Sequence, residues 1–175
     1  MAAKTGTYTL IASSTLGSGA ATVTFSSIPG TYTDLILVCK LLASSTANNS
    51  DGLRFQLNGD TASNYSATWL TNSGTTPVSS SESSATRGRF GNVSQTTNDV
   101  GTAIGQFLDY ANTTTYKTML GRSGNLNSNG DSNVFTAVSM WRSTAAVTQI
   151  VLSQSSNANF VTGTEFRLYG IEAAK

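Results

Sequence analysis

The chain has 175 residues, only 11% of them charged, and a formal net charge of +1. A charge this small offers no electrostatic footprint for nucleic acid or a membrane surface, so we expect neither as a partner. Histidine, the commonest general base and metal ligand, is absent from the sequence. A Ser-His-Asp catalytic triad is therefore impossible.

Hydroxyl side chains dominate the composition, because serine and threonine make up roughly 30% of the residues. The polar surface is thus expected to be hydroxyl and amide rather than ionic, which removes the usual charge repulsion between neighbouring molecules. Such a surface suits a protein that packs among copies of itself. The length favours a single domain spanning residues 1–175.

The N-terminal sequence MAAKTGTYTL lacks the apolar region of a secretory signal. Nowhere does the chain approach the ~18 consecutive apolar residues that a spanning helix needs. We therefore expect a soluble protein that is made in a host cell's cytoplasm.

Residues 7–13 alternate and predict a first strand, and the alternation in 22–26 predicts a strand with one wet face. Pro29-Gly30 then predicts a turn. The apolar run 35–42 predicts a strand buried on most of both faces, and we expect the strands 22–26 and 35–42 to pair as the antiparallel nucleus of a sheet. Cys39 lies inside this run, where a lone thiol behaves as a small hydrophobe.

Residues 53–58 predict another strand, which ends at the strong turn signal Asn58-Gly59-Asp60. The next segment, 64–70, fits a short helical turn as well as a strand. The tract 71–86 is mostly serine, threonine, asparagine and glycine, and it predicts a long polar surface loop. That loop could carry a short edge strand near Pro77-Val78, and a linker between two domains is the less favoured interpretation.

Short apolar or alternating runs continue to the end of the chain at 87–93, 100–110, 116–126, 134–142, 147–152 and 165–171. This spacing predicts an all-β fold, a jelly-roll-like antiparallel β-sandwich of about ten short strands. The residues predicted to face its interior include Phe25, Leu35, Leu37, Phe55, Leu57, Val138 and Leu168.

No arrangement of reactive side chains is evident along the chain. The acidic residues are scattered, mostly in predicted turns: Asp34, Asp51, Asp60, Glu82, Asp99, Asp109, Asp131, Glu165 and Glu172. Two of them could form a glycosidase pair in space, but the sequence favours no particular pair. Phosphate-binding glycine motifs are absent. The sequence therefore predicts no catalytic, cofactor-binding or metal-binding residue.

Weaker signals concern calcium, glycan attachment and sugar binding. Residues 125–130 copy the start of a calcium loop, but Thr136 stands where the motif needs glutamate, so we favour a plain loop. Four glycosylation sequons, at Asn48, Asn64, Asn92 and Asn112, are expected by chance in this composition. Four aromatic residues could form a sugar-stacking face, although a place in the core or at an interface is favoured: Tyr65, Trp69, Tyr110 and Trp141.

Three segments carry a resemblance to a known type of protein: FSSIPGTYTDLILV (25–38), LRFQLNGDTASNYS (53–66) and FRLYGI (166–171). They resemble small β-sandwich virion structural proteins of tailed bacteriophages. The similarity covers both ends and the first third of the chain, while residues 71–99 have no counterpart in it. It implies a jelly-roll-like sandwich that serves in capsid decoration (cementing) or as a tail or fibre component.

The resemblance and the composition together predict a non-enzymatic homo-oligomer, expected to be a trimer. Its predicted place is the outer capsid surface of the virion, where it would bind the major capsid protein and stabilise the shell. One alternative is a tail or fibre component that binds host-surface glycan. A remoter alternative is a polysaccharide depolymerase.

Overall fold

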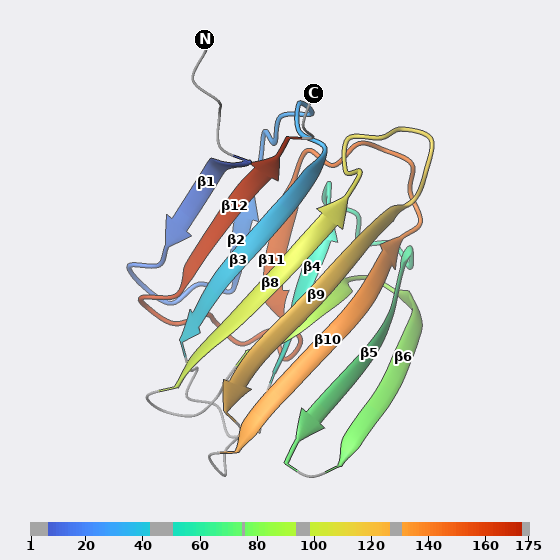
Figure 1. The fold of residues 1–175 in the computed structure, drawn as a ribbon. Helices are drawn as coiled ribbons and strands as arrows, with labels where there is room; N and C mark the ends of the chain where they lie inside the picture. The colour runs from blue at the N-terminus through green and yellow to red at the C-terminus, as the bar shows by residue number, and fades with distance from the viewer. Residues whose placement is uncertain (1–6, 43–50, 75, 94–98, 127–130, 173–175) are drawn as a thin grey trace.

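The computed structural model describes residues 7–42, 51–74, 76–93, 99–126 and 131–172. Twelve strands and no helix are found among them. The strands form two antiparallel sheets that face one another, which confirms the predicted all-β sandwich (Figure 1). None of the described segments forms a helix that could cross a membrane.

The strands are β1 Tyr8–Thr15, β2 Thr22–Phe25, β3 Asp34–Leu42, β4 Asp51–Leu57, β5 Tyr65–Ser73, β6 Pro77–Ala85, β7 Gly88–Val93, β8 Val100–Leu108, β9 Lys117–Leu126, β10 Ser132–Trp141, β11 Ile150–Gln154 and β12 Glu165–Ile171. The large sheet has eight strands in the order β1-β12-β3-β8-β9-β10-β5-β6. The small sheet has four, in the order β2-β11-β4-β7.

The strand order is that of a jelly roll with additions. Early strands pair with late ones in a nested way: β2 pairs with β11, β4 with β7, and β5 with β6. In the simplest jelly roll β3 would pair with β10, but here the β8–β9 hairpin lies between them. Strands β1 and β12 extend the large sheet on the other side of β3 (Figure 1).

The core lies between the two sheets and centres on aromatic rings. The ring of Phe55 on β4 meets Phe107 of the large sheet edge-on, with the ring centroids 5.3 Å apart, and Tyr65 at 6.0 Å. Phe90 on β7 packs beside Phe55 at 6.1 Å. Of the residues predicted to face the interior, those found buried are Phe25, Leu35, Leu37, Phe55, Leu57 and Leu168.

Val138 was assigned to the wrong face, because 48% of its surface is exposed. Strand β10 alternates strictly, and its buried set contains Phe135 and Trp141. Either set of alternate residues looked apolar in the sequence. Burying the set with two aromatic rings removes far more apolar surface from water, and this decides which face turns inward.

The predicted pairing of residues 22–26 with 35–42 is wrong, although both segments are strands. Strand β2 belongs to the small sheet and pairs with β11, whereas β3 lies between β12 and β8 in the large sheet. The turn around Pro29-Gly30 therefore crosses between layers rather than closing a hairpin. Alternation shows which side chains face the core, and strands from opposite sheets satisfy it equally well.

The predicted surface loop at 71–86 is also wrong, because most of it is strand. Strand β5 continues to Ser73, which excludes a helical turn at 64–70. After a short turn, β6 runs beside it at the edge of the large sheet as Pro77–Ala85. The edge strand suggested at Pro77-Val78 is thus correct in kind but much longer. Main-chain hydrogen bonds to β5 hold it, and these do not require apolar side chains.

Strand β3 is buried fully on one face only. Leu35, Leu37, Cys39 and Leu41 point into the core, while the alternate residues on the outer face are half-buried or exposed. The thiol of Cys39 is free and 1% exposed, and burial raises its pKa well above the usual range. This confirms the prediction that Cys39 acts as a small apolar side chain.

Candidate functional site: the outer face of the large sheet

The acidic residues do not gather into a reactive centre. Asp60 accepts hydrogen bonds from Trp141 Nε1 (2.6 Å), Asn64 Nδ2 (2.8 Å) and the Ala62 amide (2.8 Å). Burial alone would raise the pKa of Asp60, but these hydrogen bonds outweigh it and lower the pKa. Through these hydrogen bonds, Asp60 links the turn before β5 to the end of β10.

Other carboxylates have comparable structural partners. Asp34 accepts a hydrogen bond from the Asp109 amide at 2.8 Å, and Asp51 accepts one from the Ser156 amide at 3.1 Å. Glu165 forms ion pairs with Lys40 at 3.5 Å and Arg167 at 2.9 Å. Among the described residues, no three of the metal-ligating acids and the cysteine come together as a metal site would require.

The four aromatic residues considered for sugar stacking are not gathered on the surface. Tyr65, Tyr110 and Trp141 are buried in the core. Trp69 is half-buried on the inner face of β5, where the guanidinium of Arg89 lies 4.5 Å from its ring centroid. The interpretation as core side chains is confirmed for Tyr65, Tyr110 and Trp141, whereas the guanidinium of Arg89 covers Trp69.

The asparagine motifs carry no visible site either. Asn125 is buried near the end of β9, and residues 127–130 of the calcium-like segment lie outside the described residues. Asn92 is 3% exposed and accepts a hydrogen bond from Arg89, so its sequon is inaccessible in the folded chain. Asn48 also lies outside the described residues.

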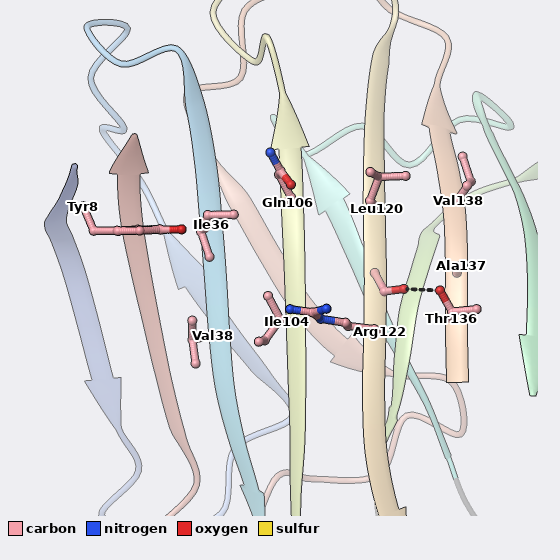
Figure 2. A pocket seen from close by; sticks show the side chains of 11 residues that line it. Tyr8, Ile36, Val38, Ile104, Gln106, Leu120, Arg122, Thr136, Ala137 and Val138 are labelled. Carbon is pink, nitrogen blue, oxygen red and sulfur yellow. Dashed lines mark hydrogen bonds between the residues drawn. The ribbon is translucent and has the colours of Figure 1, made fainter. Parts of the chain in front are cut away.

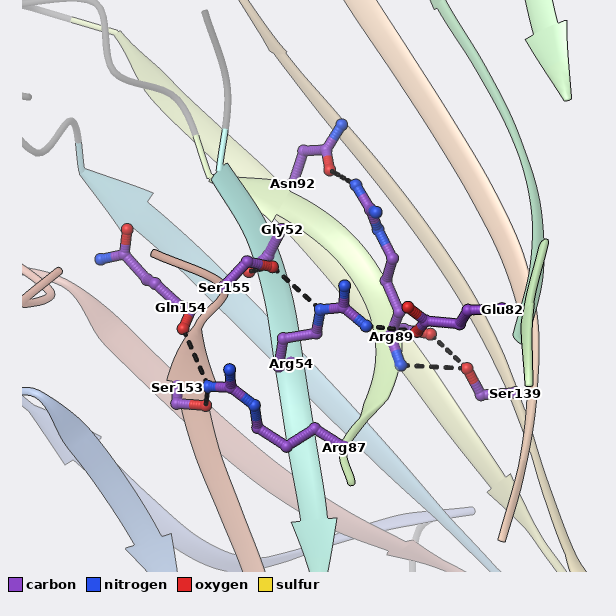
Figure 3. Close-up of polar contacts among 10 residues, drawn as sticks. All are labelled: Gly52, Arg54, Glu82, Arg87, Arg89, Asn92, Ser139, Ser153, Gln154 and Ser155. Carbon is purple, nitrogen blue, oxygen red and sulfur yellow. Dashed lines mark hydrogen bonds and ion pairs between the residues drawn. The ribbon is translucent and has the colours of Figure 1, made fainter. Parts of the chain in front are cut away.

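A cluster of arginines spans the gap between the small sheet and the far end of the large sheet (Figure 3). Arg54 on β4 forms an ion pair with Glu82 on β6, and its Nε donates to Ser155 at 2.9 Å. Burial, reinforced by the nearby charge of Arg54, lowers the pKa of Arg89 to about 10. We call Arg54, Glu82 and Arg89 the arginine bracket; the Arg54–Glu82 ion pair joins the two sheets, and Arg89 donates from Nη2 to Asn92 Oδ1 at 3.1 Å.

In contrast, the outer face of the large sheet has no layer over it in the described part of the chain (Figure 1). Large apolar side chains are nevertheless exposed there. They are Tyr8 and Leu10 on β1, Leu70 on β5, Val100 on β8, Leu120 on β9, and Val134, Val138 and Met140 on β10. Single exposed apolar residues are common on soluble proteins, but a contiguous group on one sheet face indicates a contact surface.

The strand register aligns several of these side chains into one line. Leu10 is opposite Tyr169 on β12, which is opposite Ile36 on β3. Gln106 on β8 continues the line between Ile36 and Leu120. Val138 then lies opposite Leu120. We call this line the apolar row. It crosses six adjacent strands at right angles and contains a single polar side chain, Gln106.

A shallow groove of about 590 Å³ lies along the part of the apolar row from Ile36 to Val138, and Tyr8 also lines it (Figure 2). Arg122 on β9 borders it, with its side chain extending toward Ile104 on β8. Arg122 is exposed and forms no ion pair or hydrogen bond with any described residue. Its charge is therefore available to a partner molecule.

The chemistry of the groove is suited to binding. Among the described residues that line it, only Tyr8 and Arg122 have ionisable side chains. The groove supplies apolar area, one positive charge and the hydrogen-bonding groups of Gln106 and Thr136, although Gln106 Nε2 already donates to Asp34 and the Thr136 hydroxyl to the Gly121 carbonyl, each at 3.2 Å.

Sequence reasoning missed this face. It placed Val138 inside, and it took the second apolar set of strand β3 as a sign of burial on both sides. The signal that could have found the face is the presence of apolar residues at both alternations in several strands, as with Ile36 and Val38 beside Leu35 and Leu37. No family model, curated protein or solved structure matches the chain.

Proposed function

We propose that this chain is a non-enzymatic structural protein of a tailed-phage virion. In this proposal it decorates the capsid and cements it, and it docks on the outer shell through the outer face of its large sheet. The resemblance of segments 25–38, 53–66 and 166–171 to phage virion proteins supports the phage assignment. The observation that carries the mode of attachment is the apolar row on an uncovered sheet face.

The partner is the major capsid protein, and the row defines the chemistry that it must present. Apolar side chains have to meet Leu120 and Val138, and a carboxylate should face Arg122. A shell repeats this surface many times, so that linked copies gain avidity from a modest single contact. We propose a homotrimer, which would place three such faces around a lattice axis.

The proposal predicts that apolar-row variants lose attachment while they stay folded. The double substitution Leu120→Ser and Val138→Ser removes two exposed apolar side chains, so the sandwich should fold normally. Binding to particles that lack the protein should weaken at least about tenfold, as for truncation of central interface residues. The measurement is co-sedimentation with such particles, with Tyr116→Ser, an exposed aromatic residue that belongs neither to the apolar row nor to the groove lining, as the matched control.

The same particles test the cementing role. Without the protein they should assemble but break at lower temperature or under weaker osmotic shock, because a ligand that binds only the assembled shell stabilises it by mass action. Hundreds of copies per particle would agree with decoration. Normal attachment of the double variant would overturn the docking face, and fully stable particles would overturn the cementing role.

A second candidate function is receptor binding from a tail or fibre. The observation that favours it is the groove itself, whose volume of about 590 Å³ lies within the range of small-ligand sites. The exposed ring of Tyr8 could stack on a sugar, with Gln106 and Arg122 as polar partners. Stable particles that fail to adsorb, together with glycan binding lost in Tyr8→Ala, would favour this function. Cleavage of the host polysaccharide would instead indicate a depolymerase.

A further inference from the structure

Strand β6 is the last strand of the large sheet and pairs only with β5 in the described part of the chain. Alternate residues of an edge strand direct their N–H and C=O groups away from the sheet, where they can pair with another strand. Residues Pro77 to Glu82 pair with β5 in unbroken register, and the irregularity lies between Glu82 and Ala85, where Ser84 has a φ of 54°. β6 therefore offers an edge in regular register from Pro77 to Glu82.

The other three sheet edges carry features that oppose strand addition. β1 has a register shift in its middle, between Leu10 and Ala12. β2 has only four residues. β7 has a register shift opposite Leu53 and Arg54, and Arg89 extends from it over Trp69. Short strands, bulges and charged side chains are the means by which proteins blunt their edges.

The sequence of β6, PVSSSESSA, lacks such features over most of its length. It contains no lysine or arginine, and its proline stands at the first position. Its single charged residue, Glu82, lies on the inner side and is held in the ion pair with Arg54. The exposed side chains that flank the edge are mostly serines, which are small enough to let another backbone approach on either face.

From this geometry we propose that β6 is a self-association edge, at which the β6 strands of two copies pair antiparallel around a two-fold axis. Such a contact uses the same patch on both copies. Glu82 is the single charged residue of β6, and its ion pair with Arg54 neutralises it, so two β6 strands can pair without unbalanced like charges. This favours a second copy as the occupant.

The pairing would join the two large sheets into one continuous sheet, with eight strands from each copy. A two-fold axis perpendicular to the sheet leaves both outer faces on the same side, so the apolar rows of both copies could meet one surface. The proposal stands whether or not the protein belongs to a virion. If the protein also forms the proposed homotrimer, that trimer is held by a different contact, and the β6 contact then joins two trimers.

The test introduces lysines at the edge. Ser79 and Ser81 are exposed and lie opposite Leu70 and Thr68 of β5. The double substitution Ser79→Lys and Ser81→Lys places like charges across the two-fold axis and should halve the molar mass measured by sedimentation or light scattering. The matched control is Thr102→Lys with Ser132→Lys, two exposed sites with the same added charge on β8 and β10, which should keep the wild-type mass.

Hydrogen exchange provides the second measurement. The β6 amides that face away from β5 should be protected in the wild-type protein and exchange faster in the Ser79→Lys, Ser81→Lys variant, while the core strands stay equally protected in both. A wild-type protein that stays monomeric at high concentration would overturn the proposal. An oligomer whose mass is unchanged by the edge lysines would overturn it too.

Discussion

Two regions hold the sheets together in different ways. At the centre, Phe55 of the small sheet packs against Phe90 of the same sheet and against Phe107 of the large sheet. Beyond β7, which packs mainly over β9 and β10, β6 and the part of β5 from Trp69 onward extend past the small sheet as a wing, whereas the start of β5 belongs to the centre because Tyr65 packs on Phe55. There the arginine bracket takes the place of an apolar layer (Figure 3).

The difference follows from the unequal sizes of the sheets. The four strands of the small sheet cannot cover all eight strands of the large sheet. The inner face of the wing would therefore be exposed to solvent unless other side chains covered it. Arg89 covers it with its side chain, because its guanidinium lies 4.5 Å from the Trp69 ring centroid and 5.0 Å from that of Phe135. A flat guanidinium can stack on rings and still donate hydrogen bonds, which suits a partly buried margin.

The largest expected effect comes from the centre. Phe55 is 1% exposed and packs against rings from both sheets, Phe90 of the small sheet and Phe107 of the large one, so Phe55→Ala leaves a cavity that the paired strands cannot collapse to fill. We expect the free energy of unfolding to fall by about 3–5 kcal/mol. Urea denaturation followed by circular dichroism measures it. A loss under about 1 kcal/mol would mean that the aromatic centre is not what holds the sheets together.

A smaller effect is expected at the wing. Glu82→Gln removes the negative charge between Arg54 and Arg89, which already repel one another. The pair is neither exposed nor fully buried, with side-chain exposures of 15% and 23%, so we expect a cost of about 1–2 kcal/mol. Hydrogen exchange should quicken in β5 and β6 before it does in β3.

The matched control is Glu165→Gln on the outer face. Glu165 also forms ion pairs, but its partners Lys40 and Arg167 are 49% and 53% exposed. Solvent and salt screen such pairs, so the cost should stay under about 1 kcal/mol. Equal losses for the two variants, or a loss at Glu82 spread evenly over all strands, would remove the distinction between wing and centre.

The centre could be predicted from the sequence, and the wing could not. Strong alternation around Leu35, Leu37 and Phe55 identified the buried faces, because apolar side chains dominate there and the period of a strand is two. Strand partners could not be read in the same way. Alternation is satisfied whether β2 joins β3 or crosses to the other sheet, and the hairpin β8–β9 that separates β3 from β10 leaves no local signal.

No pattern in the sequence of the wing predicted its structure. Composition assigned 71–86 to a loop because serine and threonine bury little, yet backbone pairing with β5 is enough to make β6 a strand. The arginine bracket joins residues 28 positions apart in Arg54 and Glu82, and nothing local to either residue indicates the other. The outer face was missed for a related reason, since Val138 and Phe135 look equally apolar in a short run.

Cys39 offers the finest test of the comparison, because one of its two variants should cause almost no change. Its thiol lies under the centre on β3, where burial leaves little thiolate and no access for a reagent. Native labelling at neutral pH should therefore be slow and should follow the opening of the centre. Phe55→Ala should speed it by at least about a hundredfold, since each 1.4 kcal/mol is about a factor of ten. Glu82→Gln should leave the rate almost unchanged, because opening of the wing does not expose β3.

Fast labelling of the wild-type protein would contradict the burial of Cys39. A rate raised equally by both variants would mean that centre and wing open as one unit, and the bracket would then be part of the same cooperative core.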